Sequence, residues 1–201
     1  MRRDTHRKLR SQLFVMLVAL SCAASARGAL IDESISGDIS SEIANPTPFT
    51  LDLGSNLITA HSGGLGSSGA TDGSDAEFLR VIVPDGLTLQ AISVVSREGA
   101  SARSFIAYNV GDALSGQGTG DIMDGALFEA TTQDLLDGSS SSNTDESLGV
   151  DFLGPGSYAF WIQETAGSVH YTLNFLTTPE PTPGALFALG LGLLALLRRA
   201  L

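Results

Sequence analysis

Apolar and polar residues alternate with a period of two along much of the chain. Phe49–Leu53 and Tyr171–Phe175 follow this pattern, and Glu77–Val83 and Tyr158–Gln163 place large apolar residues at every second position. Leu87–Val95 and Ser104–Val110 are further apolar stretches that we expect to be strands. Such alternation is typical of strands that bury one face. Turns rich in Gly and Pro separate the stretches, and no long helical period occurs. The sequence therefore predicts an all-β fold, a sandwich of about eight to ten short strands.

The order of strands and turns suggests two local pairings. Gly54-Ser55-Asn56 has turn chemistry, which makes Leu57–His61 the strand that returns after Phe49–Leu53. Near the C-terminus, Ala166-Gly167-Ser168 separates two alternating stretches and predicts a β-hairpin with a short loop. Residues 31–45 are mostly polar with isoleucines at spacing four, and we expect an irregular or strand-like entry to the domain.

The N-terminus has the three parts of a secretory signal peptide. Residues 1–10 are basic, residues 13–24 are apolar apart from Ser21, and Ala24-Ser25-Ala26 is a small-residue cleavage signal. We expect signal peptidase to cut after Ala26, with Ala29 as the alternative site. Cys22 is the only cysteine and lies inside this segment, so a lipoprotein is the competing interpretation. Ordinary cleavage leaves a mature chain without a disulfide.

The C-terminus has three features in order. Pro179-Glu180-Pro181 begins a Pro-rich stretch that we expect to be extended and exposed, and residues 184–197 contain only Gly, Ala, Leu and Phe. Arg198 and Arg199 follow and should stay on the cytoplasmic side of a membrane. As a helix the apolar run would extend about 21 Å, which is short for a bilayer core of about 30 Å.

This ordered set resembles the PEP-CTERM sorting tail of exported Gram-negative proteins. The resemblance implies that an exosortase, a membrane transpeptidase, cuts near Pro179, Glu180 and Pro181 and releases the domain to the outer surface or extracellular matrix. It also implies an association with exopolysaccharide. A plain C-terminal membrane anchor is the alternative. The predicted organisation is thus a signal peptide over residues 1–26, an ectodomain over 27–178 and a sorting tail over 179–201.

The ectodomain is strongly acidic. Residues 29–178 contain 20 acidic residues against Arg80, Arg97 and Arg103, a formal charge of −17. Such a surface excludes nucleic acid as a partner, because phosphates are bound by Lys and Arg. It favours a soluble, self-repelling domain or one that binds divalent cations.

Several short stretches resemble bacterial pre-peptidase C-terminal-type domains. They are Gly37-Asp38-Ile39-Ser40, Leu51-Asp52-Leu53-Gly54-Ser55-Asn56, Asp75-Ala76-Glu77-Phe78, Val83-Pro84-Asp85-Gly86 and Leu153-Gly154-Pro155-Gly156-Ser157-Tyr158. The resemblance covers most of the mature chain and implies a non-catalytic sandwich of jelly-roll type. Some of these domains bind polysaccharide or collagen, and some hold calcium.

Calcium is the one cofactor for which the residues suggest a site. Asp72, Asp75 and Glu77 stand where a Gly/Ser-rich loop enters a strand, and calcium takes six to eight oxygen ligands. Solvated loop acids are the simpler interpretation. Asp121 and Asp124 are further candidates in a second Gly-rich loop.

No residue pattern predicts catalysis. His61 and His170 fall on separate predicted strands without metal-ligand spacing, and no Gly-x-Ser-x-Gly occurs. Trp161 and the tyrosines are expected in the core, with a sugar-binding platform as the alternative. The leading hypothesis is therefore a non-catalytic surface or matrix protein, the second a calcium-dependent binding module, and the third a secreted hydrolase.

Overall fold

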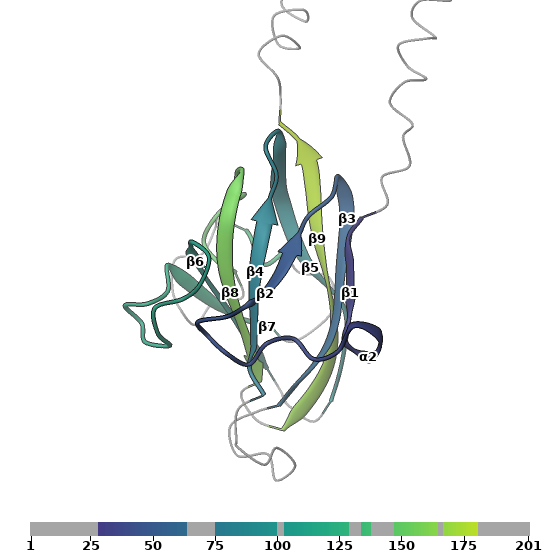
Figure 1. Ribbon diagram of the computed structural model, residues 1–201, viewed down its shortest axis with the longest axis vertical. Helices are drawn as coiled ribbons and strands as arrows, with labels where there is room; N and C mark the ends of the chain where they lie inside the picture. Colours follow the sequence, from purple (N-terminus) through teal and green to yellow (C-terminus); the bar gives the residue numbers. More distant parts are fainter. Residues whose placement is uncertain are drawn as a thin grey trace, which may run out of the picture.

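The strands form two sheets. The structure is a computed structural model that describes residues 28–63, 75–99, 103–128, 134–137, 147–164 and 167–180. One sheet has the order β1 (Leu30–Asp32), β3 (Gly54–Gly63), β9 (Ser168–Pro179) and β5 (Leu87–Gly99). The other has the order β2 (Thr47–Thr50), β4 (Glu77–Val83), β8 (Gly156–Glu164), β6 (Ser104–Val110) and β7 (Asp124–Phe128). Figure 1 shows β2, β4 and β8 in front of the sheet that contains β3 and β9, so the all-β prediction is confirmed.

Strands that follow one another in the sequence mostly lie in different sheets. β8 pairs with β4 and β6, whereas β9 pairs with β3 and β5. The predicted hairpin near the C-terminus is therefore wrong. The predicted return of Leu57–His61 against the preceding strand is also wrong, because β2 pairs with β4 and β3 pairs with β9. Alternation reports which face of a strand is buried but not which strand lies beside it.

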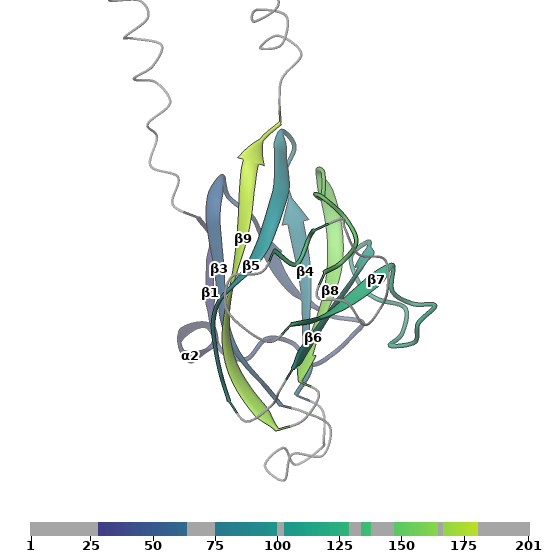
Figure 2. The same ribbon diagram turned by 180° about the vertical axis from the view of Figure 1, so that it is seen from behind.

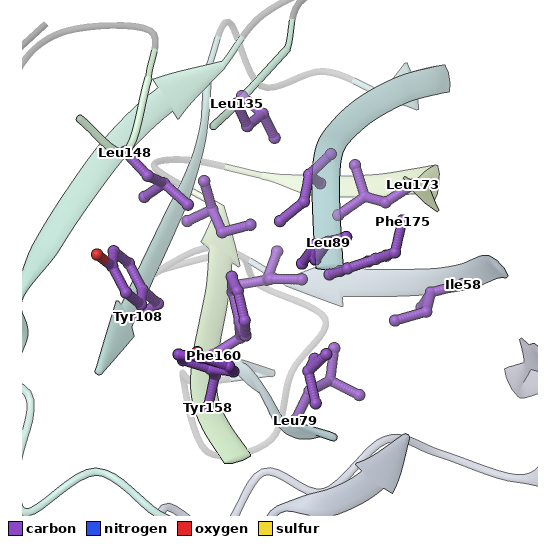
Figure 3. Packing of buried hydrophobic residues seen from close by; sticks show 14 of the residues in the cluster. Ile58, Leu79, Leu89, Tyr108, Leu135, Leu148, Tyr158, Phe160, Leu173 and Phe175 are labelled. Atoms are coloured by element: carbon purple, nitrogen blue, oxygen red, sulfur yellow. The ribbon is translucent and has the colours of Figure 1, made fainter. Parts of the chain in front are cut away.

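The buried faces agree with the alternation. Figure 3 shows Phe160 from β8 and Phe175 from β9 in the space between the sheets, where their rings meet edge to face at 5.9 Å. Leu79 and Ile58 fill the same layer and are fully buried. The three tyrosines also belong to this core, as predicted. Burial of these side chains is the main force that holds the sheets together.

Two short segments without strand structure close the side of the core. Leu135 and Leu148 are fully buried. The Leu135 amide donates to the Ile92 carbonyl at 2.8 Å, and the Leu148 amide donates to the Leu135 carbonyl at 2.7 Å. These bonds satisfy backbone groups that would otherwise be buried without partners.

The entry segment contains β1 and a four-residue helix, α2 (Glu33–Ser36). Asp32 caps the helix by accepting the Ser34 amide at 3.0 Å. The chain then turns at Gly37, whose φ of 87° suits glycine. The Phe78 amide donates to the Ser40 carbonyl at 2.8 Å, which ties this segment to β4. Figure 2, the view from behind, shows α2 beside the lower part of β3.

The Pro-rich segment begins at the C-terminal end of β9. Pro179 is the last residue of β9 and lies opposite Leu87. The Glu180 amide then donates to the Gly86 carbonyl at 2.8 Å. The sheet thus extends one residue beyond the expected boundary at 178. The signal segment with Ala26, together with Pro181, Arg198 and Arg199, lies outside the described residues; within these, no helix is long and apolar enough to cross a membrane.

Candidate metal centre

Glu77 is a fully buried carboxylate at the start of β4. Strand alternation places it on the same inward face as Leu79 and Val81, with 0% of its surface exposed. Among the residues that the structure describes, neither of its oxygens has a hydrogen-bond donor. A buried carboxylate without a donor is costly. The buried Glu77 carboxylate therefore needs a bound cation or a proton to neutralise its charge.

Glu33 and Asp38 complete an acidic cluster with Glu77. One carboxylate oxygen of each of the three residues lies within 4.8 Å of the other two. Glu77 is buried, Glu33 is half-buried and Asp38 is exposed, so the cluster extends from the core to solvent. We call these three residues the acidic cluster.

The position of Glu33 follows from the end of β1. β1 pairs in parallel with β3 as far as Asp32, and α2 then begins. Beyond the last β1–β3 pair, the Glu33 side chain bonds to the backbone instead. Its Oε2 accepts the His61 amide of β3 at 2.6 Å, and its Oε1 accepts the Ile39 amide at 2.8 Å. These two bonds fix the carboxylate while leaving lone pairs on both oxygens.

Asp38 is held near Glu77 by the residues that follow it. Ile39 is 1% exposed and anchors the segment in the core. The bond from the Phe78 amide to the Ser40 carbonyl places the segment beside the start of β4. The backbone therefore brings Asp38 to a strand that begins far away in the sequence.

Burial strongly favours the neutral form of Glu77. Desolvation, followed by the negative charges of Glu33, Asp75 and Asp38, raises its pKa to about 10. Burial also raises the pKa of Glu33, although its two backbone bonds oppose the shift. Two ionised carboxylates cannot bond to each other, but a protonated Glu77 can donate to Glu33. Without a cation, the cluster thus holds a proton at neutral pH.

Tyr171 is a further buried polar residue whose charge is influenced by Glu77. Its side chain is 1% exposed, it points inward from β9, and its hydroxyl has no hydrogen-bond partner within the described part of the chain. Burial and then the charge of Glu77 raise the pKa of this phenol well above its usual value. The phenol therefore stays neutral and adds no charge to those of the acidic cluster.

The acidic cluster suits a hard divalent cation. Three carboxylates supply only oxygen ligands, and calcium accepts such ligands in mono- or bidentate form with flexible geometry. A cation would compensate the charges that otherwise force Glu77 to hold a proton. The donor set contains no imidazole or thiolate, the ligands typical of zinc sites.

The sequence-predicted calcium residues are only partly brought together. Glu77 belongs to the acidic cluster, Asp75 acts on it through its charge, and Asp72 lies outside the described residues. Glu33 and Asp38 were missed, because nothing in a polar N-terminal segment reveals that it folds against β4. Asp121 lies apart in an exposed loop, where it accepts bonds from the Ser115 hydroxyl and the Gly118 amide.

A second group of polar side chains, formed by Ser168, His61, Asp75 and His170, lies on the outer face of the four-stranded sheet near the acidic cluster. The Ser168 hydroxyl contacts His61 Nε2, and His61 Nδ1 lies 3.5 Å from Asp75 Oδ2. His170 lies directly opposite His61, with ring centroids 4.4 Å apart. The sequence placed these histidines on separate strands but could not show that the strands are neighbours.

Trp161 occupies the outer face of the five-stranded sheet, not the core between the sheets. It is half-buried and stacks on Phe78 at 6.3 Å, while Phe105 meets it edge-on at 5.0 Å. A hollow of about 290 Å³ near Phe78 is lined also by Ser41, Ile43, Ala76, Gly116 and Gln117. Trp161 thus packs in a small apolar cluster of its own.

No family model, curated protein or solved structure matches this chain. Its function must therefore be argued from the geometry of its own residues.

Proposed function

We propose that the chain is a non-catalytic exported protein whose jelly-roll-like ectodomain binds a calcium ion at Glu33, Asp38 and Glu77. The observation that carries the proposal is the fully buried, donor-free carboxylate of Glu77 within the acidic cluster. Acidic residues gather on many surfaces without a ligand. A buried carboxylate aimed into such a group is different, because a cation relieves its desolvation cost.

Calcium is favoured over magnesium by the way the ligands are held. Glu33 is fixed by two backbone bonds, whereas Asp38 is exposed and follows a Gly37 turn. Magnesium requires near-ideal octahedral geometry and keeps several waters. Calcium tolerates irregular sites that combine fixed and mobile ligands, and it is the cation we propose.

Thermal unfolding of the exported protein tests calcium binding. Calcium at about 100 times its dissociation constant should stabilise the native state by about 2.7 kcal/mol, which raises the melting temperature by roughly 5 °C or more. Glu77→Gln should remove this response, and the exposed Glu42→Gln, outside the acidic cluster, should retain it. An equal response in wild type and Glu77→Gln would refute the site.

Export and sorting belong to the same proposal. The basic, apolar and small-residue regions of the N-terminus support cleavage after Ala26, and the Pro-Glu-Pro tail supports processing by an exosortase. β9 ends at Pro179 and the Glu180 amide is the last backbone group bonded to the sandwich, so the described fold ends within the Pro-Glu-Pro motif. The precursor would be tethered briefly to the inner membrane and then reach the cell surface or the extracellular matrix.

The intact mass of the protein recovered outside the cell tests this processing. In a host with an exosortase, the mass should lack residues 1–26 and the apolar tail. A mass that still includes residues 184–201 would support a plain membrane anchor. Capture of the same protein by the host's own exopolysaccharide would test the proposed matrix partner, with heat-denatured protein as the control.

The arrangement of Ser168, His61 and Asp75 is the strongest argument for the hydrolase alternative. It has the order of a nucleophile, a base and an orienting acid. However, Ser168 is exposed, the His61 side chain is 40% exposed, and 3.5 Å is long for the bond that orients the base. Catalysis by such a group requires water-excluded, preorganised donors for the developing charge. We therefore favour a non-catalytic protein, and labelling of Ser168 by a fluorophosphonate probe would contradict it.

A further inference from the structure

His61 and His170 form a cross-strand pair on the outer face of the four-stranded sheet. They occupy directly opposed positions on the antiparallel strands β3 and β9. Their ring centroids are 4.4 Å apart and the ring planes are tilted by 50°. His170 is exposed and His61 is partly exposed, so solvent reaches both rings. Opposed residues on one face of an antiparallel pair lie close enough for their side chains to share a ligand.

The contacts of His61 favour one tautomer. Asp75 Oδ2 lies 3.5 Å from Nδ1, and its negative charge favours a proton on that nitrogen. Nε2 then carries the lone pair, and the Ser168 hydroxyl, which contacts it, can donate to it. In metal sites the ligating histidine commonly has its other ring nitrogen beside a carboxylate, which fixes the tautomer and orients the ring. His61 has this arrangement, with Nε2 as the ligating atom.

We propose that His61 and His170 together bind a divalent transition metal of the copper and zinc class. Imidazole nitrogen is a preferred ligand of Cu²⁺, Ni²⁺ and Zn²⁺, and Cu²⁺ binds most tightly in this series. The metal would replace the Ser168 hydroxyl at His61 Nε2, and Asp75 would orient the ring. Glu98 of β5 lies opposite His170 in the register.

This site is chemically distinct from the acidic cluster. The cluster offers only carboxylate oxygens, which suit calcium, whereas the histidine pair offers two nitrogens. Both sites lie at the same end of the sandwich, since the His61 amide also donates to Glu33. His170 has no such bond to the cluster, so it is the better residue to replace.

Copper titration of the exported protein, with calcium present throughout, tests the proposal. His61 and His170 are the only histidines after Ala26, so a spectrum with two imidazole nitrogens identifies the pair. We expect one Cu²⁺ with coupling to two nitrogens by electron paramagnetic resonance. His170→Gln should leave one nitrogen and lower the affinity by at least about tenfold, since loss of a ligand should cost no less than loss of the group that orients one. Zn²⁺ should compete for the same site.

Two controls make the result decisive. The double variant His61→Gln/His170→Gln measures copper held elsewhere, including at the new N-terminus, and that value is subtracted. Glu77→Gln should leave copper binding unchanged, and His170→Gln should leave the calcium response unchanged. Wild-type affinity and an unchanged nitrogen signal in His170→Gln, or equal binding by wild type and double variant, would overturn the proposal.

Discussion

The carboxylates of Glu33 and Glu77 lie within 4.8 Å of each other at one end of the sandwich, although one belongs to a short helix and the other to a central sheet strand. The Glu33 carboxylate accepts two backbone amides, and that of Glu77 accepts none. The difference leaves Glu77 dependent on a proton or a cation.

Stability of the calcium-free protein should fall as the pH rises from about 4.5. The pKa of Glu77 is raised to about 10 in the folded state, so folding favours its protonated form. This contribution is fully present below the unfolded pKa and is lost as the pH approaches 10. By pH 7 the loss amounts to about 3 kcal/mol. Denaturant unfolding with a chelator between pH 4.5 and 9 measures it.

Glu77→Gln should stabilise the calcium-free protein at neutral pH, since Gln needs no proton to be buried. We expect a gain of about 1–3 kcal/mol in the free energy of unfolding and a flatter pH profile. The same variant should lose calcium binding, so it gains stability without calcium but loses the proposed function. A calcium-free Glu77→Gln variant less stable than wild type at pH 8 would contradict this explanation.

Asn56→Ala should lower the free energy of unfolding by about 3 kcal/mol. The buried Asn56 accepts the Ala29 and Asp52 amides and donates to the Asp52, Gly54 and Phe175 carbonyls. Its removal leaves several buried backbone groups without partners. Ser55→Ala, on the exposed face beside it, should cost less than about 0.5 kcal/mol. Similar losses in the two variants, by urea unfolding, would refute this role.

Arg97→Met should destabilise the fold by about 3–5 kcal/mol, because it leaves Glu164 charged and buried. The Arg97 guanidinium donates to Glu164 Oε2 at 3.3 Å and to Ser104 Oγ at 2.7 Å, and Ser104 donates to Glu164 at 2.6 Å. The double variant Arg97→Met/Glu164→Leu should recover much of the loss. A double variant as unstable as the single one would show that packing, not charge, explains the effect.

The buried face of several strands could be predicted from the sequence, whereas strand partners could not. Tyr171, Leu173 and Phe175 share a buried face as expected, because a period of two reports burial directly. Short Gly-containing turns join strands equally well within a sheet or across a sandwich, so the β8–β9 connection was misjudged. The sequence around the buried Leu135 and Leu148 shows no clear hydrophobic period. Their position over the side of the core is therefore visible only in the structure.

The candidate sites depend on contacts between distant parts of the chain. Glu77 could be singled out because it stands, with Asp72 and Asp75, where a Gly/Ser-rich loop enters a predicted strand. Glu33 and Asp38 stand in a polar segment that docks through the buried Ile39 and through backbone bonds to residues distant in the sequence, which no local pattern reveals. The His61–His170 pair required the β3–β9 register, which no local pattern encodes.

Calcium titration by calorimetry in buffers with different ionisation enthalpies tests the central claim most directly. At pH 7.5 Glu77 is protonated, so a cation that takes it as a ligand must displace that proton. We predict that about one proton leaves per calcium bound by the wild type and that Glu77→Gln neither binds tightly nor releases one. Calcium binding without proton release, or with equal affinity in Glu77→Gln, would contradict a site built on Glu77.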